Sequence, residues 1–188
     1  MPSLSYFACG SNMLCARLLE RRVALLDGWR AAQLHGYRLA FNKASKDGSS
    51  KANLMPEASA ASWGVLFTVD ASTLAGLVAA EGAPAHYGRA TVLVETAQGQ
   101  REAMTYLARP EKLLTALDQP WDWYLALIIV GAKSCTGIAD KGIRHIRRSG
   151  RSKPSNGQPP KPYAQATAQL KAAGHERWQG LLDGEGAP

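Results

Sequence analysis

The sequence predicts an α+β protein built on a small, mostly antiparallel, barrel-like sheet with helices packed around it. Its strand patterns come as hairpin-like neighbours, with only a few helical segments between them. The regular strand–helix alternation of a doubly wound sheet is missing, and so are the phosphate-binding patterns GxGxxG and GxxxxGK[ST]. With 188 residues, 46% of them hydrophobic, the chain is long enough to bury a sizeable core.

The N-terminal segment reads as a strand, a tight turn and a helix. Leu4–Ala8 is short, apolar and aromatic, which is typical of a central strand. Met13–Arg22 has helical periodicity, and Ser11 and Asn12 are good N-cap residues for it. We expect the apolar side of this helix to hold Leu14, Leu18 and Leu19. We expect its exposed side to hold Arg17, Glu20 and Arg21.

Three further strands are expected before the middle of the chain. Ala31–Phe41 is rich in apolar and aromatic residues, and Gly36 within it indicates a bend or bulge. Ala52–Met55 reads as a short strand that Pro56 stops. Trp63–Val69 alternates in the manner of a strand.

The second half of the chain predicts a hairpin followed by helices. Arg89–Glu95 and Arg101–Leu107 flank a short polar turn and read as paired strands. Trp121–Val130 is strongly apolar and predicts a buried helix that ends at Gly131. Asp140–Arg148 predicts another helix. We therefore divide the chain into a domain over residues 1–148 and a basic linker with a partly helical tail over residues 149–188.

The net charge of +7 is concentrated in one region. Residues 141–161 contain basic side chains and no acidic one; the basic residues are Lys141, Arg144, Arg147, Arg148, Arg151, Lys153 and Lys161. Such a run is usually a solvated surface, and the alternative is a surface for nucleic acid or an acidic membrane. It lacks interleaved aromatic residues, so we do not expect a nucleic-acid partner.

Composition also bears on location. No apolar run reaches about 18 residues, and no basic start leads into an apolar stretch, so we expect neither a membrane span nor a secretion signal. The three cysteines, Cys9, Cys15 and Cys135, have no metal-binding spacing and cannot all pair. A reduced, cytoplasmic location fits them best.

The stretch Cys9–Asn12 is the first candidate for a functional site. Gly10 can adopt a positive φ or allow a close approach to its backbone. The main-chain N–H groups at the start of the following helix would converge on one point, with the helix dipole behind them. This geometry suits a carboxylate or an oxyanion.

Glu81 is the second candidate. Asp70 is expected to cap a helix that runs from Ala71 to Ala80 or Glu81 and is ended by Gly82 and Pro84. Glu81 would follow the apolar side of this helix and lie in its last turn, so both desolvation and the helix dipole would raise its pKa. A carboxylate in that position is a candidate general base or acid. The alternative is that Glu81 turns outward at the frayed end of the helix.

Together, oxyanion donors and a base with a raised pKa suit a particular chemistry. The sequence offers no metal site and no evident nucleophile of its own. An intramolecular acyl transfer, in which the substrate supplies the nucleophile, needs neither.

Several stretches in the same order resemble the γ-glutamylcyclotransferase-like family, also called AIG2-like. The resemblance spans about Leu4 to Gly137. The stretches that carry it are Tyr6–Met13, Leu34–Lys43, Ala52–Pro56, Trp63–Phe67, Glu81-Gly82 with Tyr87-Gly88-Arg89, and Trp123-Tyr124-Leu125 with Gly131-Ala132.

The resemblance implies a compact β-barrel with packed helices that cleaves γ-glutamyl amides to 5-oxoproline and a free amine, without a cofactor or a metal. Glu81 would be the catalytic base. The implied substrate-binding residues are Tyr6, Ala8, Cys9, Gly10, Ser11, Asn12, Met13 and Tyr87. This sequence departs from the family at Cys9, where the family usually has tyrosine, and the difference bears on which substrate is bound.

Three alternatives remain from the sequence. Cys9 lies near a predicted helix N-terminus, which lowers a thiol pKa, and would then be a nucleophile. The protein would otherwise be a non-catalytic member that binds a small amino-acid-like ligand, or an interaction module that acts through its basic tail.

Overall fold

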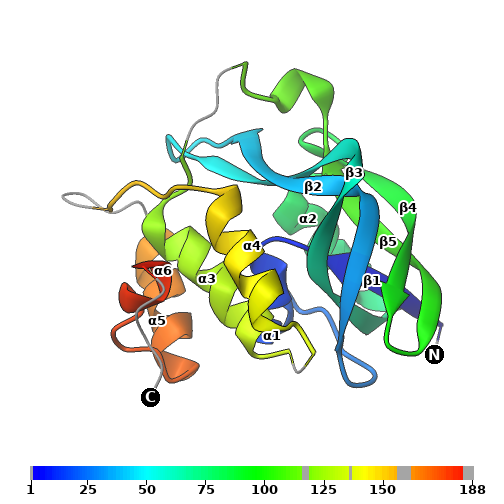
Figure 1. Cartoon of the computed structure of the whole chain (residues 1–188). Helices are drawn as coiled ribbons and strands as arrows, with labels where there is room; N and C mark the ends of the chain where they lie inside the picture. Colours follow the sequence, from blue (N-terminus) through cyan, green and yellow to red (C-terminus); the bar gives the residue numbers. More distant parts are fainter. Residues whose placement is uncertain (1, 116–118, 136, 156–161, 184–188) are drawn as a thin grey trace.

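A computed structural model describes residues 2–115, 119–135, 137–155 and 162–183, and in them five strands form a curved sheet that closes on itself (Figure 1). The strand order is β1-β3-β2-β4-β5. The strands are β1 (Ser3–Ala8), β2 (Arg30–Ala44), β3 (Ser50–Asp70), β4 (Tyr87–Thr96) and β5 (Gly99–Ala108). All neighbours are antiparallel except β1 and β5, which meet at Tyr6 and Met104 in parallel. The predicted α+β, mostly antiparallel class is confirmed.

Strand β3 corrects the prediction of two separate strands. It runs through Pro56 without a break and pairs with β2 along most of its length. Pro56 lies opposite Tyr37, next to a register shift between His35 and Tyr37. Gly36 sits in this shift with φ 78°, so the predicted bulge is confirmed. A bulge interrupts the ladder locally, and a proline is tolerated there despite its missing N–H.

The predicted helix over Met13–Arg22 is also corrected. The chain forms a short 3-10 helix, η1 (Ser11–Met13), and then α1 (Cys15–Glu20), with Leu14 extended between them. Neither Ser11 nor Asn12 caps a helix with its side chain. Within α1 Leu18 is fully buried, whereas its neighbour Leu19 is 57% exposed, so the predicted apolar side holds for Leu18 and not for Leu19.

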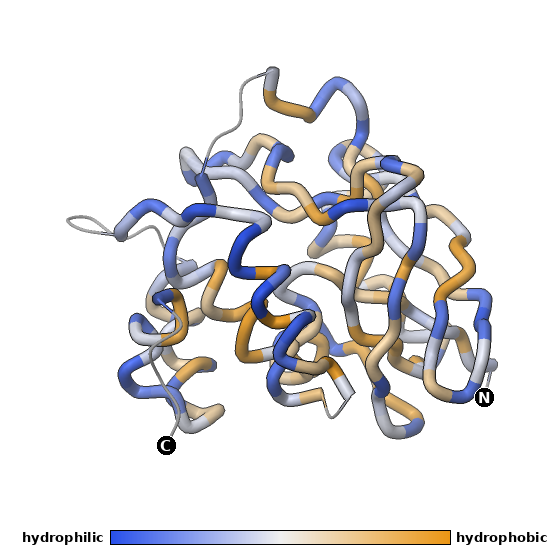
Figure 2. Tube along the Cα trace, viewed as in Figure 1, coloured by the Kyte–Doolittle hydropathy of each residue, from blue (hydrophilic) through white to orange (hydrophobic). Residues whose placement is uncertain are grey.

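Helix α3 (Asp122–Lys133) is the buried helix of the fold. Residues Trp123 to Ala132 along it are all buried, and the hydropathy colouring marks it as an apolar segment (Figure 2). The prediction that this helix ends at Gly131 is wrong, because α3 continues to Lys133. A Cβ at Gly131 would lie 2.4 Å from Leu14 N, so this glycine lets α3 and the η1 segment pack closely.

Helix α2 ends as the sequence predicts, but it begins at Leu74, because a separate 3-10 turn takes up residues 71–73 of the predicted helix. The Asp70 side chain accepts a hydrogen bond from Ser72 N and caps η2 (Ala71–Thr73), which leads into α2 (Leu74–Glu81). Gly82 closes the helix in the left-handed conformation, with φ 60°. This places Glu81 in the last turn of α2.

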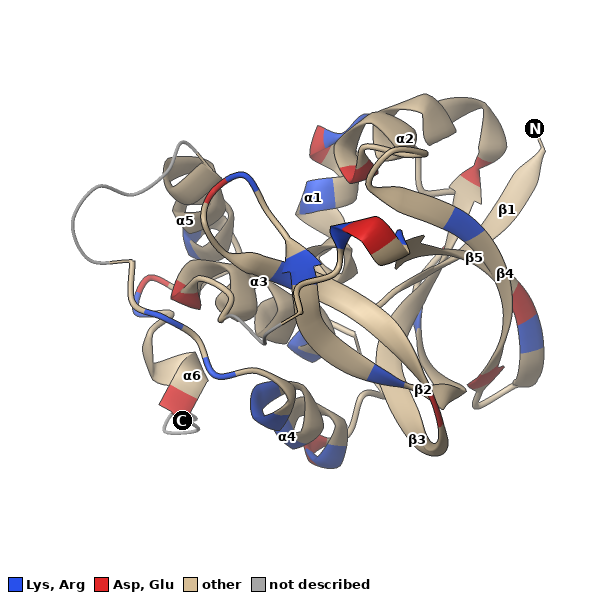
Figure 3. Cartoon of the chain, turned by 90° about the horizontal axis from the view of Figure 1, so that it is seen from above, with Lys and Arg blue, Asp and Glu red and all other residues tan. Residues whose placement is uncertain are grey.

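The C-terminal part of the described chain packs on α3. Helix α4 (Asp140–Ser149) follows the prediction and carries several basic residues (Figure 3). Helices α5 (Pro162–Ala172) and α6 (Gly180–Asp183) both contact α3, and Leu170 of α5 is fully buried. A short η3 (Pro110–Lys112) follows β5. Two parts of the predicted linker and tail lie outside the described residues: residues 156–161, which include Lys161, and residues 184–188. The division into residues 1–148 and 149–188 stays a prediction.

Among the described residues, none of the helices combines the length and the apolar character that crossing a membrane requires.

Candidate active site

A cavity of about 590 Å³ brings the two sequence candidates together. The turn after β1 contributes Gly10, Ser11 and Asn12 to its wall, and the end of α2 contributes Glu81. Tyr6, Cys9 and Tyr87 also line it. Ala8 and Met13 do not. Ala8 pairs with Val65 in the sheet, and Met13 lies against Gly131 of α3.

Glu81 turns into the cavity instead of outward. Its side chain is 16% exposed, and its Oε1 atom accepts a hydrogen bond of 2.7 Å from Asn12 Nδ2. The Arg21 guanidinium lies 3.6 Å from the same oxygen. The alternative of an outward-facing Glu81 at a frayed helix end is therefore wrong for this structure.

Burial raises the pKa of Glu81 above its ordinary value of 4.5. The Arg21 charge and the Asn12 hydrogen bond oppose this shift, as do the more distant Lys43 and Arg17, but they do not cancel it. The C-terminal end of α2 adds to the penalty, because a helix dipole disfavours an anion there. The result is a carboxylate that accepts a proton more readily than an exposed one.

Asn12 joins three polar side chains. Besides the bond to Glu81, its Nδ2 donates to Tyr6 Oη at 2.8 Å, and its Oδ1 accepts from Arg21 Nη1. Asn12 is only 4% exposed. An asparagine that uses its donors on a carboxylate and a phenol, and its acceptor on a guanidinium, fixes the orientation of all three.

Tyrosine hydroxyls form another part of the wall. Tyr87 Oη donates to Ala52 O at 2.9 Å, and Tyr124 Oη accepts from Ala52 N at 3.2 Å. A Cβ at Gly10 would lie 3.3 Å from Ala52 Cβ and 3.4 Å from Tyr124 Oη. Gly10 has φ −107°, so its role here is the close approach of neighbours and not a positive φ.

Cys9 is a buried thiol beside the carboxylate. Burial, followed by the nearby Glu81 charge, raises its pKa to about 12. A nucleophilic cysteine needs the opposite shift, because the thiolate is the reactive form. This finding argues against the nucleophile alternative.

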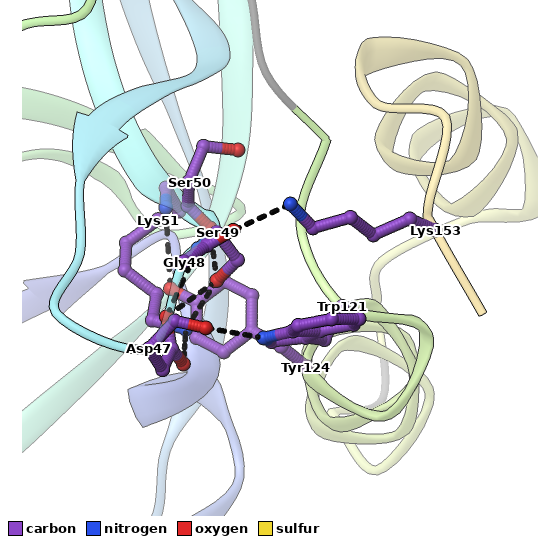
Figure 4. A network of polar contacts seen from close by, with 9 residues as sticks. Asp47, Gly48, Ser49, Ser50, Lys51, Trp121, Tyr124 and Lys153 are labelled. Carbon is purple, nitrogen blue, oxygen red and sulfur yellow. Dashed lines mark hydrogen bonds and ion pairs between the residues drawn. The ribbon is translucent and has the colours of Figure 1, made fainter. Parts of the chain in front are cut away.

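The rim of the cavity is braced by a polar network around residues 47–51 (Figure 4). Lys51 Nζ bonds Asp47 Oδ2 at 2.6 Å and Ser49 Oγ at 2.9 Å. Trp121 Nε1 donates to Asp47 O at 3.1 Å, and Lys153 Nζ donates to Gly48 O at 2.5 Å. The segment after α4 therefore helps to hold the turn between β2 and β3 in place.

Sequence reasoning missed several charged residues of the cavity. Arg17 and Arg21 were expected on the exposed side of a continuous helix, but Arg17 of α1 and Arg21, which directly follows it, both line the cavity. Lys43 and Lys51 also line the cavity. The only sequence feature that could have pointed to them is their position near the ends of predicted strands. In the described part of the chain, no group of three His, Cys, Asp or Glu side chains is placed to hold a metal ion.

Comparisons with known proteins agree with the fold. A solved structure described as a gamma-glutamyl cyclotransferase is similar with a TM-score of 0.75 and 22% identity, covering 89% of this chain and 99% of that one. The uncharacterized protein loc79017 from Homo sapiens has a TM-score of 0.73 and 22% identity, covering 88% and 98%. A gamma-glutamyl cyclotransferase specific to glutathione from yeast has a TM-score of 0.50 and 10% identity, covering 94% and 98%. These identities show likeness of fold alone.

A search of curated proteins found no match. The family model for gamma-glutamyl cyclotransferase, AIG2-like proteins matches residues 6–124, which include the turn after β1, the end of α2 and the start of α3. The match covers more than half of the chain and holds every cavity residue predicted from the sequence. The chain therefore belongs to the gamma-glutamyl cyclotransferase, AIG2-like family.

Proposed function

We propose that this protein is a γ-glutamyl cyclotransferase in which Glu81 is the general base. The observation that carries the proposal is the position of Glu81, a largely buried carboxylate held by Asn12 in a cavity that the Gly10–Asn12 turn also lines. Its raised pKa brings it closer to that of the amine it must deprotonate. Membership of the family supports the same reaction class.

The reaction needs one base and no nucleophile from the protein. Glu81 takes a proton from the α-ammonium of the γ-glutamyl group. The freed amine attacks the γ-carbonyl carbon and closes a five-membered ring. The bond from this carbon to the leaving nitrogen then breaks as Glu81 returns the proton to that nitrogen. The ring nitrogen gives up its second proton, which also passes to the leaving amine, so the amine departs with the positive charge that the α-ammonium carried. The products are 5-oxoproline and a free amine, and neither water nor an oxidant is consumed.

The turn after β1 is suited to the negative charge that develops on the carbonyl oxygen. The first N–H groups of a helical turn have no partner inside it, and η1 begins at Ser11 beside the cavity. We assign the main chain of Gly10, Ser11 and Asn12 to the substrate carboxylate or this oxyanion. Preorganised donors of this kind contribute about 3–4 kcal/mol to a barrier.

The remaining predicted residues shape the cavity. Tyr6 and Tyr87 are held by hydrogen bonds to Asn12 and to Ala52 O, which orients both rings. Cys9 occupies a place where the family usually has tyrosine, so it leaves more room beside Glu81. We retain these three as substrate-binding residues and omit Ala8 and Met13, which do not line the cavity. The cytoplasmic location inferred from the cysteines stays a prediction.

A product assay tests the proposal. The purified protein is incubated with γ-glutamyl amino acids and γ-glutamyl amines, and 5-oxoproline, glutamate and the free amine are quantified. We expect 5-oxoproline and amine in equal amounts and no enzymatic glutamate. Glutamate in place of 5-oxoproline would indicate hydrolysis and contradict the mechanism. Binding of these compounds without any turnover would favour the non-catalytic alternative.

A further inference from the structure

A second pocket, with a volume of about 390 Å³, lies between α2 and the β4–β5 hairpin. Its apolar part is formed by Leu74 and Val78 of α2 and by Ala83 and Pro84, which follow the helix. Leu74 is half-buried and Val78 is 38% exposed, so this apolar surface is open to a ligand. Pockets of about this volume hold small organic molecules.

Two arginines form the polar part of the pocket. Arg89 of β4 and Arg109, which follows β5, are both exposed, and the described lining contains no acidic residue. In the part of the chain that the structure describes, neither guanidinium has a carboxylate oxygen within 4.0 Å. Arg109 Nε donates to Pro84 O at 3.0 Å, which holds this guanidinium beside the pocket. Two positive charges therefore border an apolar surface without an anion to neutralise them.

The strand pairing directs both arginines to the pocket. Arg89 lies opposite Tyr106 in the β4–β5 register, so these two side chains share one face of the hairpin. Burial and then the Glu81 charge raise the pKa of Tyr106, and the Arg89 charge opposes this rise, as a neighbouring cation would. A Cβ at Gly88 would lie 3.6 Å from Arg109 Cζ, so Arg109 lies against the main chain of β4.

We propose that this pocket binds a small apolar carboxylate, whose anion pairs with Arg89 and Arg109 while its hydrocarbon part lies on Leu74 and Val78. A guanidinium binds a carboxylate through two parallel hydrogen bonds, which favours this anion. Residues four apart on a helix lie about 6 Å apart along its axis, so a ring with a short chain covers both apolar side chains. A cationic ligand of the same shape would be repelled by the two arginines.

Matched probes test each part of the proposal. The probes 3-phenylpropanoate, 3-phenylpropanamide and 3-phenylpropylamine share a ring and a chain but carry a negative, a neutral and a positive group, and acetate carries the carboxylate without the hydrocarbon. Each is titrated into ¹⁵N-labelled protein, and the backbone amide shifts give both the affinity and the place of binding. Because Tyr106 lines this pocket and the candidate active-site cavity, the place of binding must be measured.

We expect 3-phenylpropanoate to bind with a dissociation constant of about 1 mM, which is usual for a ligand of this size. Its largest amide shifts should fall at Leu74–Val78 and Gly88–Arg89. The carboxamide should bind about tenfold more weakly, since it loses a charge-assisted contact. The amine and acetate should not saturate, and added salt should weaken the binding of 3-phenylpropanoate.

Variants assign the charge contact to the two arginines. Arg89→Met and Arg109→Met keep an apolar side chain and remove the charge, and each should weaken 3-phenylpropanoate by about tenfold while changing the affinity for the carboxamide by less than about twofold. Arg101→Met is the matched control. Arg101 is an exposed arginine of the same hairpin that donates to the main-chain oxygen of Gln100 at 3.1 Å, but it lies outside the pocket lining. The affinity of this control should equal that of the wild type.

Four results would overturn the proposal: no binding of 3-phenylpropanoate up to about 20 mM, equal affinity for its carboxamide, equal affinity for acetate, or wild-type affinity in both arginine variants. Amide shifts confined to Gly10–Asn12 and Glu81 would also overturn it, because they would place the probe in the candidate active-site cavity. The proposal does not rest on the cyclotransferase activity. Each measurement is of binding, so a failure to release 5-oxoproline leaves this pocket untouched, and an empty pocket leaves the proposed reaction standing.

Discussion

Replacing Asn12 by alanine isolates the control that this residue exerts over the proposed base. Asn12 Nδ2 donates to Glu81 Oε1 at 2.7 Å, and this bond favours the charged carboxylate. In Asn12→Ala the bond is lost while Glu81 stays buried. The pKa of Glu81 should therefore rise further above 4.5, and the acidic limb of kcat/KM should move to higher pH.

The size of the shift follows from the contacts. A hydrogen bond to a charged acceptor contributes about 1.5–3 kcal/mol, and one pKa unit corresponds to about 1.4 kcal/mol. Loss of the whole bond would therefore raise the pKa of Glu81 by at most about two units. Arg21, at 3.6 Å, would partly compensate, and the 16% exposure of Glu81 admits some water. We therefore expect the lower end, a rise of about one unit.

The assay is the pH dependence of kcat/KM for 5-oxoproline release, which reports the pKa of the free enzyme. Asn53→Ala is the matched control. Asn53 is 3% exposed and bonds Asn42 and Ala108 N, but it lies outside the cavity lining. We expect this control to lose stability without moving the acidic limb. If the acidic limb of Asn12→Ala lies at the same pH as that of the wild type, or at a lower pH, the assigned link between Asn12 and Glu81 is refuted.

Other consequences concern Cys9, the packing of α3 and the burial of Glu81. Because the Cys9 thiol has a pKa of about 12 and is protonated at neutral pH, Cys9→Ser should keep turnover within about threefold, whereas a nucleophile would lose it. Gly131→Ala would place a Cβ 2.4 Å from Leu14 N and should lower stability in denaturant melts by about 1–3 kcal/mol, while Gly28→Ala, with nothing within 4 Å, should be neutral. The pKa of Glu81 is raised in the folded protein, so the wild type loses stability as the pH rises from the pKa of the unfolded chain to that of the folded one. Glu81→Gln has no carboxyl group to ionise and avoids that loss. The melting temperature of Glu81→Gln minus that of the wild type should therefore increase from pH 4 to pH 7.

The sequence was sufficient for features that depend on neighbouring residues. Asp70 and Gly82 bound the α2 region as predicted, because capping and a left-handed C-terminal residue are local chemistry. The β4–β5 hairpin and the bulge at Gly36 were predictable for the same reason. These elements place Glu81, which is why it could be identified as a candidate before its surroundings were known.

Features that depend on distant contacts could not be read from the pattern. Pro56 is typical of a strand end, yet β3 continues through it and pairs with β2 on both sides of it, next to a bulge. Arg17 and Arg21 read as an exposed side, because nothing in the pattern shows that the chain straightens at Leu14 before α1. The role of Asn12 as a donor to Glu81 joins residues 69 positions apart. The cations that give the cavity its charge were missed for the same reason.

The most direct test of Glu81 as the base is the rate of 5-oxoproline release by Glu81→Gln on a γ-glutamyl substrate that the wild type turns over. The amide keeps the shape and an acceptor for Asn12 but cannot take up the proton. Glu57→Gln is the control, since Glu57 lies on β3 outside the cavity and pairs with Arg38. We predict a loss of about 10²–10⁴-fold in Glu81→Gln, with its melting temperature at pH 7 no lower than that of the wild type, and no loss in Glu57→Gln. A folded Glu81→Gln protein that retains the wild-type rate would contradict the account.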